Sequence, residues 1–436
     1  MRRLVRLLIT VASVLSAGWA GANPLVYVTH YSNGKVSLID MGTGVSLATI
    51  TVGGNPWGIA ITPNGTRAYV ANDTVSEIAV IDTASNTVSK SIPVGGRSRG
   101  IVVSPDGARV YVAVGGSDNA VAIDTATDTV SAVIPITVGI PGDVLGGISV
   151  TPDGRSVYVD TYMSNSVSVI STATDTVVAT IPVEDGPFWI AIAPDGTRAY
   201  VTNYFGGSVS TIDLASNTVI ASVPVGSTAR ELAVTPDGKQ VYVGVTNDDH
   251  LDVISTDTNA IVQSIVTNQW PLGVAALSDG STVYVAIESS PYQIAVISTA
   301  TGTITESISV LFRPWGLAIL PGPRQVAIDI KPGDSQNAIN LASAGVIPVA
   351  VLSSASFNAL DVDPATVSLA GATGKVAGKN GRYFSHAEDV NGDGLLDLVC
   401  QVYTAQFEPG TTTAVLKAKT FGGQLLRGWD TITIVR

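Results

Sequence analysis

Alternating apolar and polar residues form short stretches along most of the chain, and a Tyr-Val dipeptide recurs within them at a regular step. The dipeptides begin at Tyr27, Tyr69, Tyr111, Tyr158, Tyr200, Tyr242 and Tyr284. Successive tyrosines are 42 residues apart, except that 47 residues separate Tyr111 from Tyr158. A period near 42 residues with about four short strands per repeat is typical of a β-propeller blade. The pattern therefore predicts an all-β chain that contains a seven-bladed β-propeller.

The repeat around Tyr69 shows the elements expected in each blade. Strands are predicted over 57–61, 68–71, 78–82 and 88–94, and Pro63-Asn64-Gly65 makes a tight turn between the first two. Related turns begin at Pro105, Pro152, Pro194 and Pro236. Glycine tolerates positive φ, and Asp or Asn bonds nearby backbone N–H groups. We therefore assign these repeated residues to turns and not to a functional site.

The ends of the repeat array indicate how the ring closes. The array begins with a strand of the second type at Tyr27 and ends with one of the first type over 315–319. One blade is therefore built from both ends of the array, which hides the sheet edges. We place the propeller at residues 23–321, with the five extra residues of the long interval in a loop within 134–147.

One repeat carries a family signature. Tyr200-Val201-Thr202-Asn203 is followed by the strand 209–213. With these residues the chain resembles the YVTN β-propeller family of secreted and surface-layer-type proteins, over about residues 24–320. More distantly it resembles seven-bladed lactonase-like propellers. The resemblance implies the fold, and it names no reaction, because the repeated residues are packing and turn residues.

A second domain follows the array. Pro321-Gly322-Pro323 marks the boundary, and strands are predicted over 326–330, 346–352, 395–402, 412–419 and 431–435. These strands favour a small β-sandwich-like module at residues 326–436. Segments 328–333, 345–350 and 386–394 resemble a C-terminal module of secreted bacterial proteins, and this resemblance implies no activity.

The C-terminal module holds a loop rich in oxygen-bearing side chains. Calcium takes six to eight oxygen ligands, and an EF-hand loop supplies them from alternate positions. Cys400 stands where such a loop has its bidentate glutamate. The loop predicts a partial, structural Ca²⁺ site, and the alternative is an acidic turn that binds no ion. The proposed ligands are Asp389, Asn391, Asp393, Asp397 and the backbone carbonyl of Leu395.

Composition and the N-terminus bear on partners and localisation. The formal net charge is −12, which argues against a nucleic-acid partner. Arg2, Arg3 and Arg6 precede an apolar run at 7–15, and Ala20-Gly21-Ala22 resembles a cleavage site. Residues 1–22 are therefore read as a signal peptide, since the run is too short for a membrane anchor. We expect an exported protein, periplasmic, extracellular or at the cell surface, with no transmembrane segment in the mature chain.

Loops that enter the first strands and leave the second strands share one face of a propeller. Aromatic and arginine side chains in such loops suit a protein, peptide or glycan partner. The alternative is that each tryptophan packs at a blade junction. The residues assigned to this ligand face are Trp57, Arg99, Trp189, Arg230, Trp270, Trp315, His30 and Tyr204.

No strong catalytic motif accompanies the repeat. The three histidines are too few for a multi-copper centre, and Gly96-Arg97-Ser98-Arg99-Gly100 matches a nucleophile elbow without its flanking helix. The leading hypothesis is a non-catalytic interaction scaffold of the cell envelope, with no catalytic residues assigned. A surface-coat component without a ligand is a further possibility. The alternative of a lactonase-like hydrolase would draw on Arg99, Arg230, Glu231, His30 and Glu288 at the channel mouth.

Overall fold

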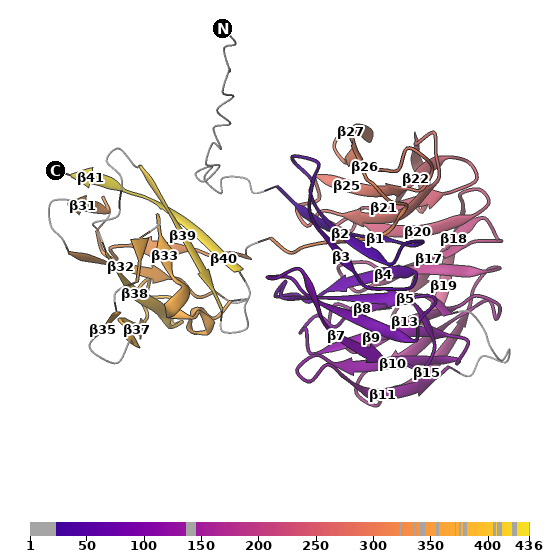
Figure 1. The fold of residues 1–436 in the computed structure, drawn as a ribbon, viewed down its shortest axis with the longest axis horizontal. Coiled ribbons are helices and arrows are strands. Elements are labelled where there is room, and N and C mark those ends of the chain that lie inside the picture. The colour runs from indigo at the N-terminus through magenta and orange to yellow at the C-terminus, as the bar shows by residue number, and fades with distance from the viewer. Residues whose placement is uncertain are drawn as a thin grey trace, which may run out of the picture.

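The computed structural model of the chain describes residues 23–136 and 145–322, and most of 324–435. Within 324–435 the description omits 335, 341–344, 355–356, 371, 375, 378–381, 404–406, 408–411 and 421–424. The predicted signal peptide and the core of the long loop, 137–144, lie outside the described residues. The chain is all-β, and Figure 1 shows the C-terminal strands gathered apart from the strands of the repeat array.

The described part of the repeat array forms seven four-stranded antiparallel sheets, which confirms the seven-bladed propeller. We number them in chain order: blade 1 is β28-β1-β2-β3, and blades 2 to 7 are β4–β7, β8–β11, β12–β15, β16–β19, β20–β23 and β24–β27. The innermost strands of adjacent blades contact one another in a closed cycle, from β4 round to β28 and back to β4.

Each blade contributes strands of four types. The innermost are β28 (Pro314–Ile319), β4 (Pro56–Ile61), β8 (Arg97–Val103), β12 (Leu145–Val150), β16 (Pro187–Ile192), β20 (Ala229–Val234) and β24 (Pro271–Ala276). The second strands are β1 (Leu25–His30), β5 (Arg67–Asn72), β9 (Arg109–Gly115), β13 (Ser156–Thr161), β17 (Arg198–Asn203), β21 (Gln240–Val245) and β25 (Thr282–Ile287).

The two outer types complete the blades. The third strands are β2 (Lys35–Asp40), β6 (Glu77–Asp82), β10 (Asn119–Asp124), β14 (Ser166–Ser171), β18 (Ser208–Asp213), β22 (His250–Ser255) and β26 (Gln293–Ser298). The outermost strands are β3 (Val45–Thr51), β7 (Thr87–Pro93), β11 (Thr129–Pro135), β15 (Thr176–Pro182), β19 (Thr218–Pro224), β23 (Ala260–Val266) and β27 (Thr303–Ser309).

The predicted closure of the ring is present. β1 pairs antiparallel with β28, with Val26 opposite Ile319, so the two ends of the array form one sheet. Apolar side chains of successive blades then pack face to face; Tyr69, Val80 and Val112, for example, share one buried cluster between blades 2 and 3. The core of the propeller is therefore distributed between blades and does not lie in one place.

The repeat tyrosines of blades 1 and 4 tie their blades to the next blade. The hydroxyl of Tyr27 donates to Asn86 Oδ1 at 2.6 Å, and that of Tyr158 donates to Asn217 Oδ1 at 2.8 Å. Both acceptors lie in the turn between the third and outermost strands, with φ of 55° and 53°. Asn tolerates this left-handed backbone better than most residues, so the turn residue and the interblade bond are coupled.

The C-terminal residues form two main sheets around one core. One sheet has the order β29-β40-β39-β33-β34 and the other β30-β32-β38-β37, with two-stranded sheets β31-β41 and β35-β36 beside them. Leu369, Leu416 and Leu426 of the first sheet share a buried cluster with Ile330, Val349 and Leu398 of the second. This packing of two sheets confirms the β-sandwich-like fold class.

The elements of this module are short. Its strands are β29 (Arg324–Gln325), β30 (Ile328–Ile330), β31 (Ala338–Asn340), β32 (Val346–Val351), β33 (Ser368–Leu369), β34 (Ala372–Thr373), β35 (Val376–Ala377), β36 (Arg382–Tyr383), β37 (Ser385–Glu388), β38 (Asp397–Tyr403), β39 (Thr413–Lys419), β40 (Leu425–Thr431) and β41 (Thr433–Val435). Two 3₁₀ turns, η1 (Ala359–Asp361) and η2 (Pro364–Thr366), join them. No helix among the described residues is long and apolar enough to cross a bilayer.

Candidate functional site

Residues near the start of the innermost strands meet at one end of the central channel. We call this set the mouth ring: Trp315, Trp57, Arg99, Gly146, Phe188, Arg230 and Leu272, in blade order. Trp57 belongs to β4 and Phe188 to β16, three blades apart, yet their ring centroids are only 6.3 Å apart. Side chains of the mouth ring therefore reach across the channel.

Aromatic rings pack closely at the blade 1 and blade 2 side of the mouth. The centroids of Trp57 and Trp315 are 4.5 Å apart, and Tyr31 lies 4.8 Å from Trp315. Trp57 and Trp315 are each only 5% exposed. These two tryptophans are therefore buried against each other at the junction of blades 1 and 2.

A second aromatic group lies on the blade 4 and blade 5 side and reaches the surface. Phe188 lies 5.7 Å from Tyr204, and Tyr162 lies 5.4 Å from Phe205. Phe205 is 60% exposed. This half of the cluster offers aromatic surface to a partner, because its outermost ring is not covered by the protein.

Three arginines stack on these rings. Arg99 lies 4.5 Å from the Trp57 centroid, and Arg313 lies 5.3 Å from Trp315. Arg230 lies 5.4 to 5.6 Å from three rings: Tyr204, Phe188 and Trp315. Attraction between a guanidinium and a ring face holds each charge at the channel mouth.

Two of the arginines have carboxylate partners. Arg99 Nε lies 3.0 Å from Asp73 Oδ1, and Arg313 is paired with Glu288. Both carboxylates come from the residue directly after a second strand, β5 or β25. The charges on this face are therefore mostly neutralised within the protein.

Glu231 follows Arg230 and is the most perturbed acid near the channel. The corresponding residue in five other blades is glycine, at Gly58, Gly100, Gly147, Gly273 and Gly316. Glu231 is 5% exposed, and its Oε1 has no hydrogen-bond partner among the described residues. Burial raises its pKa to about 8, although the charge of Arg230 and a bond from the Val274 N–H act in the opposite direction.

The structure brings some of the predicted ligand-face residues together and separates others. Trp57, Trp315, Arg99, Arg230 and Tyr204 form the aromatic–arginine cluster. Trp189 is half-buried, and Trp270 is 47% exposed. Among the described residues, neither Trp189 nor Trp270 has an aromatic ring stacked on it.

His30 is buried, and among the described residues its ring stacks on none of the rings of this cluster. Its Nε2 lies 2.8 Å from Ser37 Oγ, and its ring meets Phe312 edge-on at 5.4 Å. Burial lowers the pKa of His30 to about 4, and Lys35 acts in the same direction. His30 is therefore neutral at neutral pH and does not face the mouth ring with a charge.

Sequence reasoning missed Phe188, Phe205 and Arg313. A signal for Phe188 was available: Pro187-Phe188 matches Pro56-Trp57 and Pro314-Trp315 in the repeat. Trp189 was assigned to the site instead, because tryptophan is the more conspicuous residue. Phe205 and Arg313 lie in loops where no repeated residue marks them.

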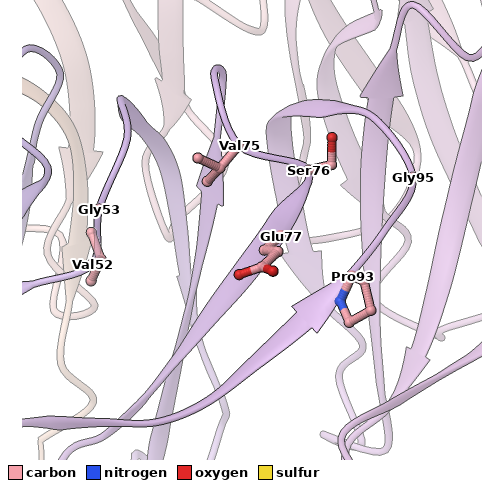
Figure 2. Close-up of a pocket in the computed structure, with 7 residues that line it drawn as sticks. All are labelled: Val52, Gly53, Val75, Ser76, Glu77, Pro93 and Gly95. Atoms are coloured by element: carbon pink, nitrogen blue, oxygen red, sulfur yellow. The ribbon is translucent and has the colours of Figure 1, made fainter.

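A shallow hollow lies elsewhere on the same face, between loops of blades 1 and 2 (Figure 2). Its volume is about 440 Å³. Glu77 is its one ionisable lining side chain, and no aromatic residue lines it. The hollow has less capacity for specific recognition than the aromatic–arginine cluster, so we take the cluster as the candidate site. The hollow is lined by Val52, Gly53, Val75, Ser76, Glu77, Pro93 and Gly95.

The acidic loop of the C-terminal module is folded around its own side chains. Asp389 Oδ1 accepts the N–H of Gly392 at 2.8 Å, and Asp393 Oδ1 accepts that of Leu395 at 2.8 Å. Asn391 lies between them, with Oδ1 3.1 Å from the Asp393 N–H. No three His, Cys, Asp or Glu side chains of the described residues are placed to hold one metal ion.

Asp397 has a different environment from the other residues of the loop. It is fully buried and accepts the N–H groups of Ser353 at 2.7 Å and Val390 at 3.1 Å. Both of its oxygens are therefore engaged in holding the loop to β32, whereas Asp389, Asn391 and Asp393 are exposed. Asp397 fits a supporting role better than the ligand role assigned to it from the sequence.

Comparison with known proteins supports the fold. Residues 110–234 match the model of the YNCE-like β-propeller family. A protein of unknown function from Desulfotomaculum acetoxidans has a TM-score of 0.60 and 20% identity, covering 68% of this chain and 98% of its own. No match was found among curated proteins.

Two further solved structures are similar. A candidate 6-phosphogluconolactonase from Bacteroides fragilis has a TM-score of 0.59 and 18% identity, covering 69% of this chain and 99% of its own. Hydrazine synthase from Kuenenia stuttgartiensis has a TM-score of 0.55 and 21% identity, and the match covers 60% of this chain and 88% of its own. At these identities the similarity shows a shared β-propeller fold and not a shared activity.

Proposed function

We propose that this protein is an exported, non-catalytic binding scaffold that presents the aromatic–arginine face of its propeller to a protein, peptide or glycan. The observation that carries the proposal is the continuous cluster from Trp57 to Phe205, in which buried rings support exposed ones. Rigid aromatic surface beside arginine is the composition that binding hot spots favour.

The charges on this face support binding over catalysis. Arg99 and Arg313 are held in ion pairs, and His30 is buried with a lowered pKa. General acid–base catalysis needs a titratable side chain within hydrogen-bond reach of the proton that it transfers. Three of the residues considered for a hydrolase, Arg99, Glu288 and His30, are instead engaged with other side chains of the protein.

The test is a thermal-shift panel on the purified protein with neutral oligosaccharides, envelope glycans, peptides and lactones. We expect a saturable rise in Tm with one binding class and its loss in Phe205→Ser. Val133→Ser, which removes an exposed apolar side chain from the outermost strand β11, is the matched control and should bind as the parent does. Binding that survives Phe205→Ser would place the site elsewhere.

The alternative is a lactonase-like hydrolase, and Glu231 is the observation that favours it. A carboxyl group with a pKa of about 8 is protonated at neutral pH and can act as a general acid. Lactone turnover that Glu231→Gln abolishes, with folding intact, would establish this function over the scaffold. Absence of turnover with a lactone series would remove it.

We also propose a structural Ca²⁺ site in the C-terminal module, with Asp389, Asn391 and Asp393 as side-chain ligands and the Leu395 carbonyl as a further ligand. Three exposed oxygen-bearing side chains within five residues support it. At ten times its dissociation constant, Ca²⁺ would stabilise the protein by about 1.4 kcal/mol. A Tm that is the same in chelator and in millimolar calcium, or a calcium shift that persists in Asp393→Ala, would contradict the site.

A further inference from the structure

Repeat symmetry allows Arg230 to be compared with Arg99, because each directly precedes the same repeat position, occupied by Gly100 in blade 3 and by Glu231 in blade 6. Arg99 lies 26 residues after Asp73, and its Nε donates to Asp73 Oδ1 at 3.0 Å while Nη2 lies 3.5 Å from Oδ2. Arg230 lies 26 residues after Tyr204. The repeat therefore supplies a carboxylate to Arg99 and a phenol ring to Arg230.

The guanidinium of Arg230 lacks the partner that Arg99 has. No carboxylate of the described residues forms an ion pair with Arg230. Its Nε is buried and has no hydrogen-bond partner within the described part of the chain. A buried donor without an acceptor is costly, and such groups often mark a ligand site.

The surroundings of Arg230 leave its charge uncompensated. Tyr204, Phe188 and Trp315 surround the guanidinium and supply ring faces. The neighbouring Glu231 has its pKa raised to about 8 by burial, so it is mostly protonated at pH 7. Positive charge therefore persists at the mouth of the channel, on an otherwise acidic protein.

We propose that Arg230 binds a carboxylate of the ligand, in the place that the Asp73 carboxylate takes beside Arg99. This inference rests on the proposed binding function and names the chemistry of its ligand. The rings around Arg230 select a carboxylate attached to a planar or apolar group, because that group stacks on Tyr204 and Phe188 while the oxygens pair with the guanidinium.

The probes are phenylacetate and its neutral isostere phenylacetamide, titrated into the full chain and followed by ligand-observed NMR. We expect saturable binding of phenylacetate and at least tenfold weaker binding of phenylacetamide, because a charge-assisted bond is lost. Phenyl phosphate, as a second anion of similar size, separates a carboxylate site from a general anion site.

Two variants assign the binding to Arg230. Tyr204→Asp places a carboxylate where blade 2 has Asp73, and it should reduce phenylacetate affinity at least tenfold by pairing with Arg230. Val133→Ser, on the outermost strand β11 and outside the aromatic–arginine cluster, should bind as the parent does. Arg230→Gln should abolish the preference for phenylacetate over phenylacetamide. A cooperative melt for each variant shows that folding is retained.

The outcomes are distinct. Equal affinity for the acid and the amide, tighter binding of phenyl phosphate, or unchanged binding in Tyr204→Asp would overturn the carboxylate assignment. A neutral glycan or peptide that binds the face, with no carboxylate binding, would overturn this inference and leave the scaffold proposal standing. Loss of all binding would overturn both.

Discussion

Single residues on the innermost strands decide how closely the blades approach. A Cβ added at Gly316 would lie 2.5 Å from the carbonyl oxygen of Trp57 on the adjacent innermost strand. Glycine at this place is therefore required by the close contact of two backbones. Blade 6 carries Glu231 there instead. This position is glycine in five of the seven blades. The two blades without glycine there carry Trp189 and Glu231, which lie next to the candidate site.

Substitution of Gly316 tests whether glycine is required where the two backbones make close contact. We expect Gly316→Ala to lower the free energy of unfolding by about 1–3 kcal/mol, because the methyl group forces the two strands apart. Gly322→Ala is the control, since a Cβ there meets no atom within 4 Å. Chemical denaturation of both variants provides the measurement, and equal stability would contradict the close contact.

The buried acid predicts a pH dependence of stability. The native pKa of Glu231 is about 8 and its ordinary value is 4.5, so the folded protein keeps a proton that the unfolded chain has lost. The free energy of unfolding should therefore fall as pH rises from about 4.5 to 8. His30 contributes the opposite slope, but only between about pH 4 and 6.5, where its native and ordinary pKa values lie.

Between pH 6.5 and 8, the pH dependence of the free energy of unfolding reports on Glu231 without a contribution from His30. Between pH 6.5 and 8 we expect the free energy of unfolding of the parent to fall by on the order of 2 kcal/mol, since one pH unit corresponds to about 1.4 kcal/mol. Arg230 is the charged group that acts on Glu231. In Glu231→Gln the contribution of this group disappears, and a slope identical to that of the parent would exclude Glu231 as its source.

The strands of the propeller follow the hydrophobic pattern of the repeat. The contacts between blades depend in addition on polar residues at fixed positions of the repeat. Each second strand is buried almost throughout, as in β5, because both of its faces meet other strands. The outermost strands alternate exposed and buried residues only near their ends. Hydrogen bonds from tyrosine to the next blade then set the stagger between sheets.

Removal of the Tyr158 hydroxyl tests the hydrogen bond between neighbouring blades. We expect Tyr158→Phe to destabilise the protein by about 1 kcal/mol, because Asn217 loses its donor. The hydroxyl of Tyr242 lies 3.2 Å from Gln240 of its own strand, so Tyr242→Phe removes no bond between blades among the described residues. Urea denaturation of the pair should show the larger loss for Tyr158→Phe.

One element of the C-terminal module shows why pattern alone is insufficient. The strand β40, Leu425–Thr431, was not predicted, because Gly428 and Asp430 interrupt its apolar alternation. A Cβ at Gly428 would lie 2.7 Å from the carbonyl oxygen of Val326. The glycine that weakens the local signal is therefore needed for the approach of the chain just before β30, a contact about 100 residues away in sequence.

At the scale of the whole molecule, the ring is closed by strands from opposite ends of the array. β28 gives blade 1 its innermost strand and pairs with β1. Without β28, β1 has an unpaired edge and the cycle of innermost strands is open. Closure therefore makes the stability of the N-terminal strands depend on residues almost 300 positions later.

Truncation provides the test. We expect a chain that ends after residue 322 to keep a single cooperative melt for the propeller, and a chain that ends after residue 313 to lose it. The two chains differ by nine residues, which include β28. Circular dichroism on heating distinguishes them, and a cooperative melt for the shorter chain would show that closure is not required.

The sequence by itself determined the propeller, its seven blades and the strand borrowed from the other end, because a 42-residue period repeats the same local rules seven times. It also named five residues of the aromatic–arginine cluster, although most of the residues assigned to the ligand face lie within strands and not in loops. Only the tertiary structure decided which of them pack and which face solvent. Trp57 and Trp315 are buried against each other, whereas Phe205 is exposed. The pairing of Arg99 with Asp73, and the absence of such a partner for Arg230 among the described residues, depend likewise on distances across blades that no local pattern records.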